Sequence, residues 1–229
     1  MHVEIWSDIA CPWCYVGKRR FEAALAGFDH RDDVTVTWRS FELDPGAPAE
    51  REGELAAHLA SKYGSSVEQA RARQAQITEL AAADRLEFRF DRARGGNTFD
   101  AHRLVHLAEA HGLQDAMQER LMRAYQSEGA LMSDHPTLAR LAGEVGLPAA
   151  EVDELLAGDR FAAEVRDDER TGATLGITGV PFFVVDRAFG ASGAQPPELL
   201  RELLDRAWEA RSAIPVVATG ESCGVDGCY

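Results

Sequence analysis

The sequence predicts an α/β fold that is interrupted by a large all-helical insertion. Two observations predict it: strand-like runs occur near the two ends of the chain, and helix follows helix between them. Each flanking piece is too small to make a sheet alone, so we expect both to contribute to one sheet. The predicted parts are a discontinuous α/β domain of residues 1–45 and 160–212, a helical insertion of residues 46–159, and a C-terminal tail of residues 213–229.

The N-terminal piece begins with a strand, a helix and a second strand. Hydrophobic residues alternate in His2–Trp6 and again in Val34–Trp38, a pattern typical of strands. Between them, the amphipathic run Val16–Leu25 predicts a helix that ends near Gly27. Strand, helix and strand in this order indicate a parallel pair of strands.

The insertion consists of helices separated by glycines. Gly64, Gly112, Gly146 and Gly158 mark the C-terminal ends of helices, and Leu86–Phe90 is an extended stretch among them. The predicted helices are Glu50–Tyr63, Val67–Ala83, Phe99–His111, Leu113–Tyr125, Pro136–Val145 and Pro148–Leu156.

The C-terminal piece returns to the sheet. A helix over Phe161–Leu175 precedes the apolar strand Phe182–Val185. A turn and a further short strand follow, and Gly190 and Gly193 bracket this possible hairpin. The run Pro196–Arg211 closes the domain as a helix with a leucine-rich face.

The charge of the chain restricts its partners. Its 229 residues include 38 acidic and 24 basic side chains, for a formal net charge of −14. This charge repels phosphate backbones and anionic lipids, so we expect no nucleic acid and no membrane partner. No signal peptide and no apolar run of roughly 20 residues is evident, which favours a cytoplasmic protein. The oligomeric state does not follow from the sequence.

The four cysteines occur as two pairs, Cys11 with Cys14 and Cys223 with Cys228. In a reducing compartment such pairs are typically catalytic, redox-sensing or metal-binding. Cys11 lies between the first strand and its helix, where Pro12 suits the first helical turn and makes Cys11 the N-cap or its neighbour. A helix N-terminus favours the thiolate, which is the form that attacks disulfides. The first pair therefore predicts a dithiol catalyst.

Trp13 lies between the two cysteines of that pair. Unlike an imidazolium at this position, its indole supplies no positive charge to the Cys11 thiolate. We therefore expect a less oxidising dithiol than the strongest periplasmic oxidants. The flat ring is suited to contact an unfolded or loop substrate, and simple packing is the alternative explanation.

Three phrases of the chain indicate a family. They are S-D-I-A-C-P-W-C-Y-V-G-K at Ser7–Lys18, N-T-F-D-A-H-R-L at Asn97–Leu104 and G-I-T-G-V-P-F-F at Gly176–Phe183. With them, and with the helical block, the chain resembles the DsbA-like branch of the thioredoxin superfamily, and most of all its FrnE-type oxidoreductases. The resemblance covers nearly the whole chain and implies a thioredoxin-like fold.

The resemblance also implies roles for individual residues. Cys11 is the expected nucleophile and Cys14 the resolving thiol, and the spacing supports this because it puts both sulfurs on one side of the helix start. Val180 and Pro181 occupy the place of the superfamily's cis-proline, where a cis bond would turn the Val180 backbone toward the dithiol and a substrate strand. An ordinary trans bond is the alternative. The expected substrate-binding residues are Pro12, Trp13, Val180 and Pro181.

A segment of the insertion is also expected near the active-site groove. The resemblance suggests this for Asn97, Thr98, His102 and Arg103, although a capped helix start explains the same residues. His102 and His106 share a helix face, but without an adjacent third ligand we expect no metal there.

The second cysteine pair lies in the tail, which we expect to be mobile and long enough to reach the dithiol. Our hypothesis is that Cys223 and Cys228 exchange electrons with Cys11 and Cys14. The alternative is an incidental or independently oxidised tail.

The sequence therefore predicts a cytosolic thiol–disulfide oxidoreductase or protein disulfide isomerase. Its expected substrates are polypeptide thiols and disulfides, with no bound cofactor and with glutathione or another thiol as redox partner. One alternative is a glutathione-dependent small-molecule isomerase, because the 2-hydroxychromene-2-carboxylate isomerases resemble this chain, although they generally place serine at the nucleophile position. Further alternatives are a structural zinc protein that uses all four cysteines, and a redox-linked holdase chaperone.

Overall fold

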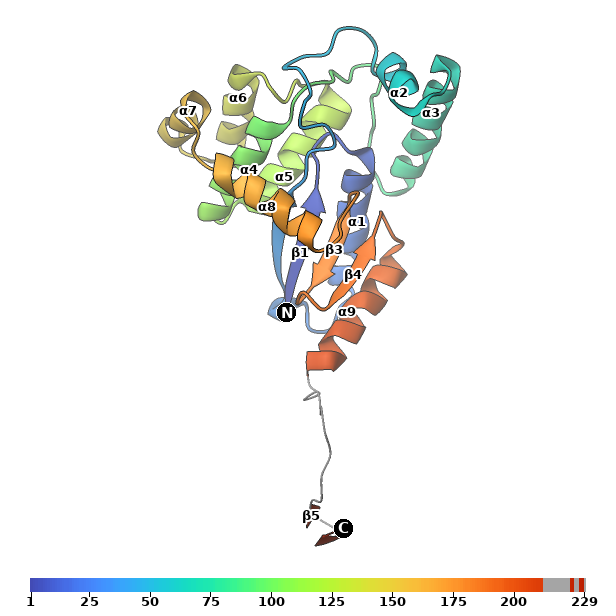
Figure 1. The fold of residues 1–229 in the computed structure, drawn as a ribbon, viewed down its shortest axis with the longest axis vertical. Helices are drawn as coiled ribbons and strands as arrows, with labels where there is room; N and C mark the ends of the chain where they lie inside the picture. The colour runs from blue at the N-terminus through green and yellow to red at the C-terminus, as the bar shows by residue number, and fades with distance from the viewer. Residues whose placement is uncertain (212–222, 225–226, 229) are drawn as a thin grey trace.

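A mixed four-stranded sheet of order β2-β1-β3-β4 forms the centre of the computed structural model (Figure 1). The structure describes residues 1–211, 223–224 and 227–228. Strand β1 (His2–Ser7) is parallel to β2 (Thr35–Ser40) and antiparallel to β3 (Phe182–Val185), which in turn is antiparallel to β4 (Phe189–Ser192). The two ends of the sequence therefore build one sheet, as predicted.

The two faces of the sheet are covered by different helices (Figure 1). Val3 and Ile5 belong to a buried cluster with residues of α1 (Pro12–Ala26) and α9 (Pro197–Arg211). Trp6, one position on, has the opposite orientation, and its indole Nε1 donates a hydrogen bond of 2.9 Å to the Asp168 carbonyl of α8 (Ala162–Thr174). The period-2 alternation of β1 thus assigns alternate side chains to the two helical layers.

The helical insertion lies at the end of the sheet where β1 leads into α1, with α4–α7 to one side and α2–α3 to the other (Figure 1). None of the described helices has the length and hydrophobicity to cross a membrane. The elements are α2 (Leu55–Tyr63), α3 (Val67–Ala83), α4 (Phe99–Ala110), α5 (Gln114–Arg123), the π-helical turn η2 (Ala124–Glu128), α6 (His135–Val145) and α7 (Ala149–Ala157), with a 3-10 turn η1 (Arg31–Asp33) before β2.

Some predicted boundaries were wrong. Residues 50–54 are not helical, and Gly53 has a φ of +86°, a left-handed value that ends any continuous helix. The stretch Leu86–Phe90 interrupts the helices, as predicted, and belongs to no strand. Gly190 lies within β4 and does not bracket the hairpin of β3 and β4, whose turn contains Asp186 and Arg187 with φ values of 47° and 53°.

The sheet and the insertion share buried hydrophobic contacts. One cluster contains Ile5 and Phe183 of the sheet together with Leu104, Leu121 and Leu141 of the insertion. The predicted domain boundaries at residues 45 and 160 stay a prediction, and this shared core indicates that the two parts support one another's folding.

A buried lysine fixes α1 to the insertion. The side chain of Lys18 is 2% exposed, and its ammonium pairs with Glu22 of α1 and with Asp115 of α5, at 3.1 Å. Glu119 of α5 accepts a further hydrogen bond, of 2.6 Å, from the Tyr15 hydroxyl. These contacts hold the first half of α1, which carries the dithiol, against α5.

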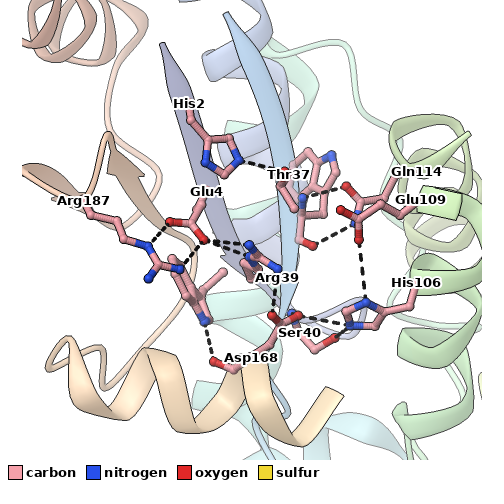
Figure 2. A network of polar contacts seen from close by, with 12 residues as sticks. His2, Glu4, Thr37, Arg39, Ser40, His106, Glu109, Gln114, Asp168 and Arg187 are labelled. Atoms are coloured by element: carbon pink, nitrogen blue, oxygen red, sulfur yellow. Dashed lines mark hydrogen bonds and ion pairs between the residues drawn. The ribbon is translucent and has the colours of Figure 1, made fainter. Parts of the chain in front are cut away.

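A second polar network lies on the face of the sheet that α8 covers (Figure 2). Glu4 of β1 accepts hydrogen bonds from Arg39 of β2 and from Arg187 after β3, at 2.8–3.1 Å. Arg39 also donates to Asp168 of α8, and the same carboxylate lies 3.1 Å from Nε2 of His106. The network therefore joins two strands to α8 and α4.

We expect the Glu4 contacts to stabilise the fold in a pH-dependent way. Burial disfavours the Glu4 carboxylate, but the hydrogen bonds and charges of Arg187 and Arg39 outweigh burial and hold its pKa below the ordinary value. The lowered pKa of Glu4 stabilises the folded state. This stabilisation is fully present above the ordinary pKa of about 4.3, and it is lost as the pH falls through the pKa that Glu4 has in the folded state.

The measurement is urea unfolding of Glu4→Gln between pH 3 and 8. We expect a loss of roughly 1–3 kcal/mol at neutral pH, because two guanidinium groups lose a charged acceptor. The difference from the unmodified protein should shrink below about pH 4. Glu52→Gln, at an exposed position, is the control and should change little. A difference in the free energy of unfolding that persists unchanged at low pH would contradict the lowered pKa of Glu4.

Candidate active site

Cys11 occupies the N-cap of α1. Its backbone is extended, with φ −84° and ψ 115°, and Pro12 follows at the first helical position. The Cys11 N–H donates to the Asp8 carbonyl at 3.1 Å, which holds the turn between β1 and α1. The first turn of the helix, Pro12–Tyr15, contains no acidic residue. The positive end of the helix dipole is therefore not neutralised within this turn.

The two sulfurs of the motif have different surroundings. Both thiols are free, and both residues are buried, yet Cys11 lines a cavity and Cys14 does not. Burial, together with the hydrogen bond and charge of Cys11, raises the pKa of the Cys14 thiol well above its ordinary value. Cys14 thus stays protonated at neutral pH, and Cys11 is the sulfur that a substrate can reach.

The Val180–Pro181 segment lies directly against Cys11. The peptide bond between these residues is cis, as predicted. The Cys11 Sγ lies 3.7 Å from the Val180 carbonyl oxygen, so the segment before β3 forms the opposite side of the reactive sulfur. Gly17 of α1 packs against Pro181 with no space for a side chain, because a Cβ there would come within 2.8 Å of the proline Cγ.

A cavity of about 480 Å³ begins at the dithiol. Cys11, Pro12, Trp13 and Val180 line it on the side of the sheet, and residues of α2 and α3 line it on the side of the insertion. The structure therefore brings the predicted nucleophile and three of the predicted substrate-binding residues to one concave surface. Their roles stay predictions.

The predicted groove residues of the insertion lie in different places. Thr98 lines the cavity, whereas the side-chain oxygen of Asn97 accepts the Phe99 N–H at 2.8 Å, at the start of α4. Arg103 is turned away and donates to the carbonyls of Leu155, in the last turn of α7, and of Gly158 and Arg160, which follow that helix. Its guanidinium therefore supplies hydrogen-bond donors to the carbonyl groups at the C-terminal end of α7.

The two histidines of α4 have different neighbours. His102 is buried 3.5 Å from the Asp8 carboxylate, while His106 lies in the network of Figure 2. Among the side chains that the structure describes, no three His, Cys, Asp or Glu groups come together as a metal site.

Asp8 is a residue of the site that the sequence analysis did not single out. Its carboxylate is buried and accepts the N–H groups of Ala10, at 3.2 Å, and of Leu43, at 2.8 Å. It therefore shapes the turn that delivers Cys11 and joins that turn to the loop after β2. The signal was present, since a carboxylate directly after a strand and three residues before a reactive cysteine is an Asx-turn candidate.

Comparison with known proteins agrees with this geometry. Residues 2–205 match the family described as the DSBA-like thioredoxin domain. This chain belongs to the DsbA-like thioredoxin family. A probable DsbA oxidoreductase from Streptomyces coelicolor is 48% identical, and the match covers 100% of this chain and 98% of the other with a TM-score of 0.89. The predicted thioredoxin-like fold is confirmed.

Two more distant structures share the DsbA-like fold. The cytosolic disulfide reductase DsbM from Pseudomonas aeruginosa is 22% identical, over 93% of this chain and 100% of its own, with a TM-score of 0.67. A 2-hydroxychromene-2-carboxylate isomerase is 11% identical, over 93% of this chain and 98% of its own, also with a TM-score of 0.67. At these identities the likeness concerns the fold alone.

The second cysteine pair of this DsbA-like chain is described only through its backbone. Strand β5 (Cys223–Gly224) pairs antiparallel with β6 (Gly227–Cys228), which places Cys223 opposite Cys228. The rest of the predicted tail lies outside the described residues. Exchange with the first pair and zinc binding by all four cysteines therefore stay predictions.

Proposed function

We propose that this chain is a cytosolic, FrnE-type thiol–disulfide oxidoreductase or protein disulfide isomerase that acts on polypeptide substrates. The observation that carries the proposal is the asymmetry of the dithiol. The Cys11 sulfur borders a cavity at a helix N-terminus, whereas Cys14 is buried and protonated beside it. A reactive outer thiol and a protected inner thiol are what a two-step exchange requires.

In the reducing direction, the Cys11 thiolate attacks one sulfur of a substrate disulfide. A Cys11–substrate disulfide forms, the substrate S–S bond breaks, and the second substrate sulfur leaves as a thiolate that takes up a proton. Cys14 then loses its proton and attacks the Cys11 sulfur, which releases the first substrate sulfur. Two electrons have passed from the dithiol to the substrate. The reverse sequence oxidises a substrate dithiol.

The residues around Cys11 are suited to hold an extended peptide. The Val180 backbone next to the sulfur offers strand-like hydrogen bonds, and the Trp13 ring offers an apolar surface. Pro12 and Pro181 complete the substrate-binding set. Glutathione or another thiol is the proposed redox partner, and DsbM, a cytosolic disulfide reductase of the same fold, supports the compartment.

The second pair is proposed to exchange electrons with the first. Directly opposed residues in an antiparallel pair have Cα atoms roughly 4.5–5.5 Å apart, within the range that a disulfide spans. This backbone spacing supports the proposed second redox pair.

The test is the equilibrium of the Cys11–Cys14 pair with glutathione buffers, in the full chain and in Cys223→Ser/Cys228→Ser. A potential below about −250 mV indicates a reductase, and one near or above about −200 mV indicates an oxidant or isomerase. Exchange with neither glutathione nor a disulfide-containing peptide would contradict the proposal. Identical potential and turnover without the tail thiols would contradict the electron exchange between pairs.

A glutathione-dependent small-molecule isomerase is the second candidate, favoured by the cavity of about 480 Å³. Cys11→Ser separates the two functions. Isomerase turnover that survives this substitution supports the second candidate, whereas loss of peptide disulfide exchange supports the first.

A further inference from the structure

The segment before β3 is held by the loop that follows β4. Gly193 begins this loop and donates its N–H to the Pro181 carbonyl at 2.8 Å. Its φ of +80° lies in the left-handed region that favours glycine. The next residue, Ala194, packs against the hydrophobic cluster that contains Cys11, and so does Val180. The position of the Val180–Pro181 segment at the reactive sulfur therefore depends on the position of this loop.

One guanidinium of α1 fixes the loop after β4. The Nη1 of Arg20 donates a hydrogen bond of 2.7 Å to the Ala194 carbonyl oxygen. The Arg20 side chain is only 19% exposed, and a hydrogen bond from a charged donor is stronger than one between neutral groups. The helix that begins at Cys11 thus also carries the group that holds the loop.

The same guanidinium reaches the end of α3. Its Nε donates to Oδ2 of Asp84 at 3.0 Å, and Asp84 is the C-cap of α3. The Asp84 side chain is 21% exposed, so the ion pair is partly shielded from water. In the last two turns of α3, Ile77 and Ala81 pack in the cluster that contains the dithiol. Arg20 therefore joins α1 to two segments, 64 and 174 positions further along the chain, that both pack at the dithiol.

We propose that Arg20 is a positioning residue for disulfide exchange, which sets the spacing between the Val180–Pro181 segment and α3 around Cys11. The proposal rests on the proposed function and concerns how its polypeptide substrate is held. Arg20 does not line the cavity and acts through the loop after β4. An extended peptide that pairs with the Val180 backbone needs this backbone at a fixed distance from the sulfur, because small misplacements of reacting groups slow a reaction strongly.

Two disulfides are the probes. A peptide with one disulfide can pair with the Val180 backbone, whereas 2-hydroxyethyl disulfide has no peptide backbone. The pre-reduced full chain reduces each one over a range of disulfide concentrations. Acid-quenched samples analysed by mass spectrometry then give the limiting rate and the half-saturating concentration.

Arg20→Gln should lower the efficiency with the peptide relative to 2-hydroxyethyl disulfide roughly 3- to 10-fold. The fall should come from a higher half-saturating peptide concentration, because the substrate is held less well. A fraction of unfolded protein lowers both efficiencies equally, so it leaves their ratio unchanged. The ratio therefore reports the position of the segment and not the stability of the variant.

Asp84→Asn tests the link to α3. This variant keeps the hydrogen bond to Ala194 and removes the charge that pairs with Arg20, so we expect the ratio to fall about two- to threefold. Arg20→Gln/Asp84→Asn should fall no further than Arg20→Gln alone, because Asp84 acts through Arg20. A fall equal to the product of the two single effects would overturn the link to α3. If Arg20→Gln does not fold, the ratio in Asp84→Asn decides the proposal.

Arg201→Gln is the matched control. Arg201 of α9 is also a partly buried arginine that pairs with a carboxylate, Asp205, at 3.1 Å, but it packs over Phe28 after the far end of α1. Its ratio should equal that of the unmodified chain. An unchanged ratio in Arg20→Gln, or an equal fall in Arg201→Gln, would overturn the positioning role. If the unmodified chain reduces neither disulfide, the proposed function itself fails.

Discussion

Replacing Cys14 by serine is expected to trap the substrate on the protein. Cys11 borders the cavity and remains able to attack a peptide disulfide, whereas the buried thiol that would release the product is gone. The reaction should therefore stop at a Cys11–peptide mixed disulfide. Non-reducing electrophoresis and mass spectrometry of the adduct measure it, and reductase turnover should fall by roughly three orders of magnitude or more.

Cys11→Ser should lose turnover to a similar extent without forming any adduct, because a serine hydroxyl is not ionised at neutral pH. The pair of variants therefore tests the assignment of roles as well as the need for both thiols. Cys223→Ser/Cys228→Ser is the control for attack by the tail, since a trapped adduct must persist without these thiols. An adduct on Cys14 in Cys11→Ser would show that the roles are reversed.

The N-terminal part of the site could be predicted from the sequence because its determinants are local. Alternation in β1, the proline after Cys11 and the amphipathic run behind it define a strand, an N-cap and a helix within 26 residues. The same local rules failed at residues 50–54, where helix-forming residues surround Gly53 with its positive φ. They also ended the fourth predicted insertion helix at Tyr125 and gave no sign of the π-helical turn there.

The rest of the site depends on contacts between distant segments. Asp8 meets Leu43 and His102 across 35 and 94 positions, and Gln74 enters the lining only because α3 lies beside the dithiol end of α1. Sequence periodicity identifies the buried face of a helix, but it does not identify the element that this face contacts. The resemblance placed Val180 at Cys11 because it supplied that long-range information.

The close packing of α1 against the Pro181 segment gives the second large effect. Alanine is favoured over glycine in a helix interior by about 1 kcal/mol, so Gly17→Ala would ordinarily stabilise α1. Here the new Cβ would lie 2.8 Å from the Pro181 Cγ and 3.4 Å from the Phe183 ring. Neither group is the end of a flexible chain, and overpacking of this kind costs about 1–3 kcal/mol. We expect a net loss of up to about 2 kcal/mol in urea unfolding.

The same substitution should slow exchange, because relief of the contact moves Val180 and Pro181 away from the helix start and from the Cys11 sulfur 3.7 Å away. Gly143→Ala in α6 is the matched control, since its Cβ would meet no described atom within 4 Å and should add up to about 1 kcal/mol at unchanged activity. Comparison of the two substitutions thus separates the effect of helix propensity from the effect of packing. If Gly17→Ala were as stable and as active as Gly143→Ala, the Pro181 segment would not be held by α1, and the position of Val180 beside Cys11 would need another cause.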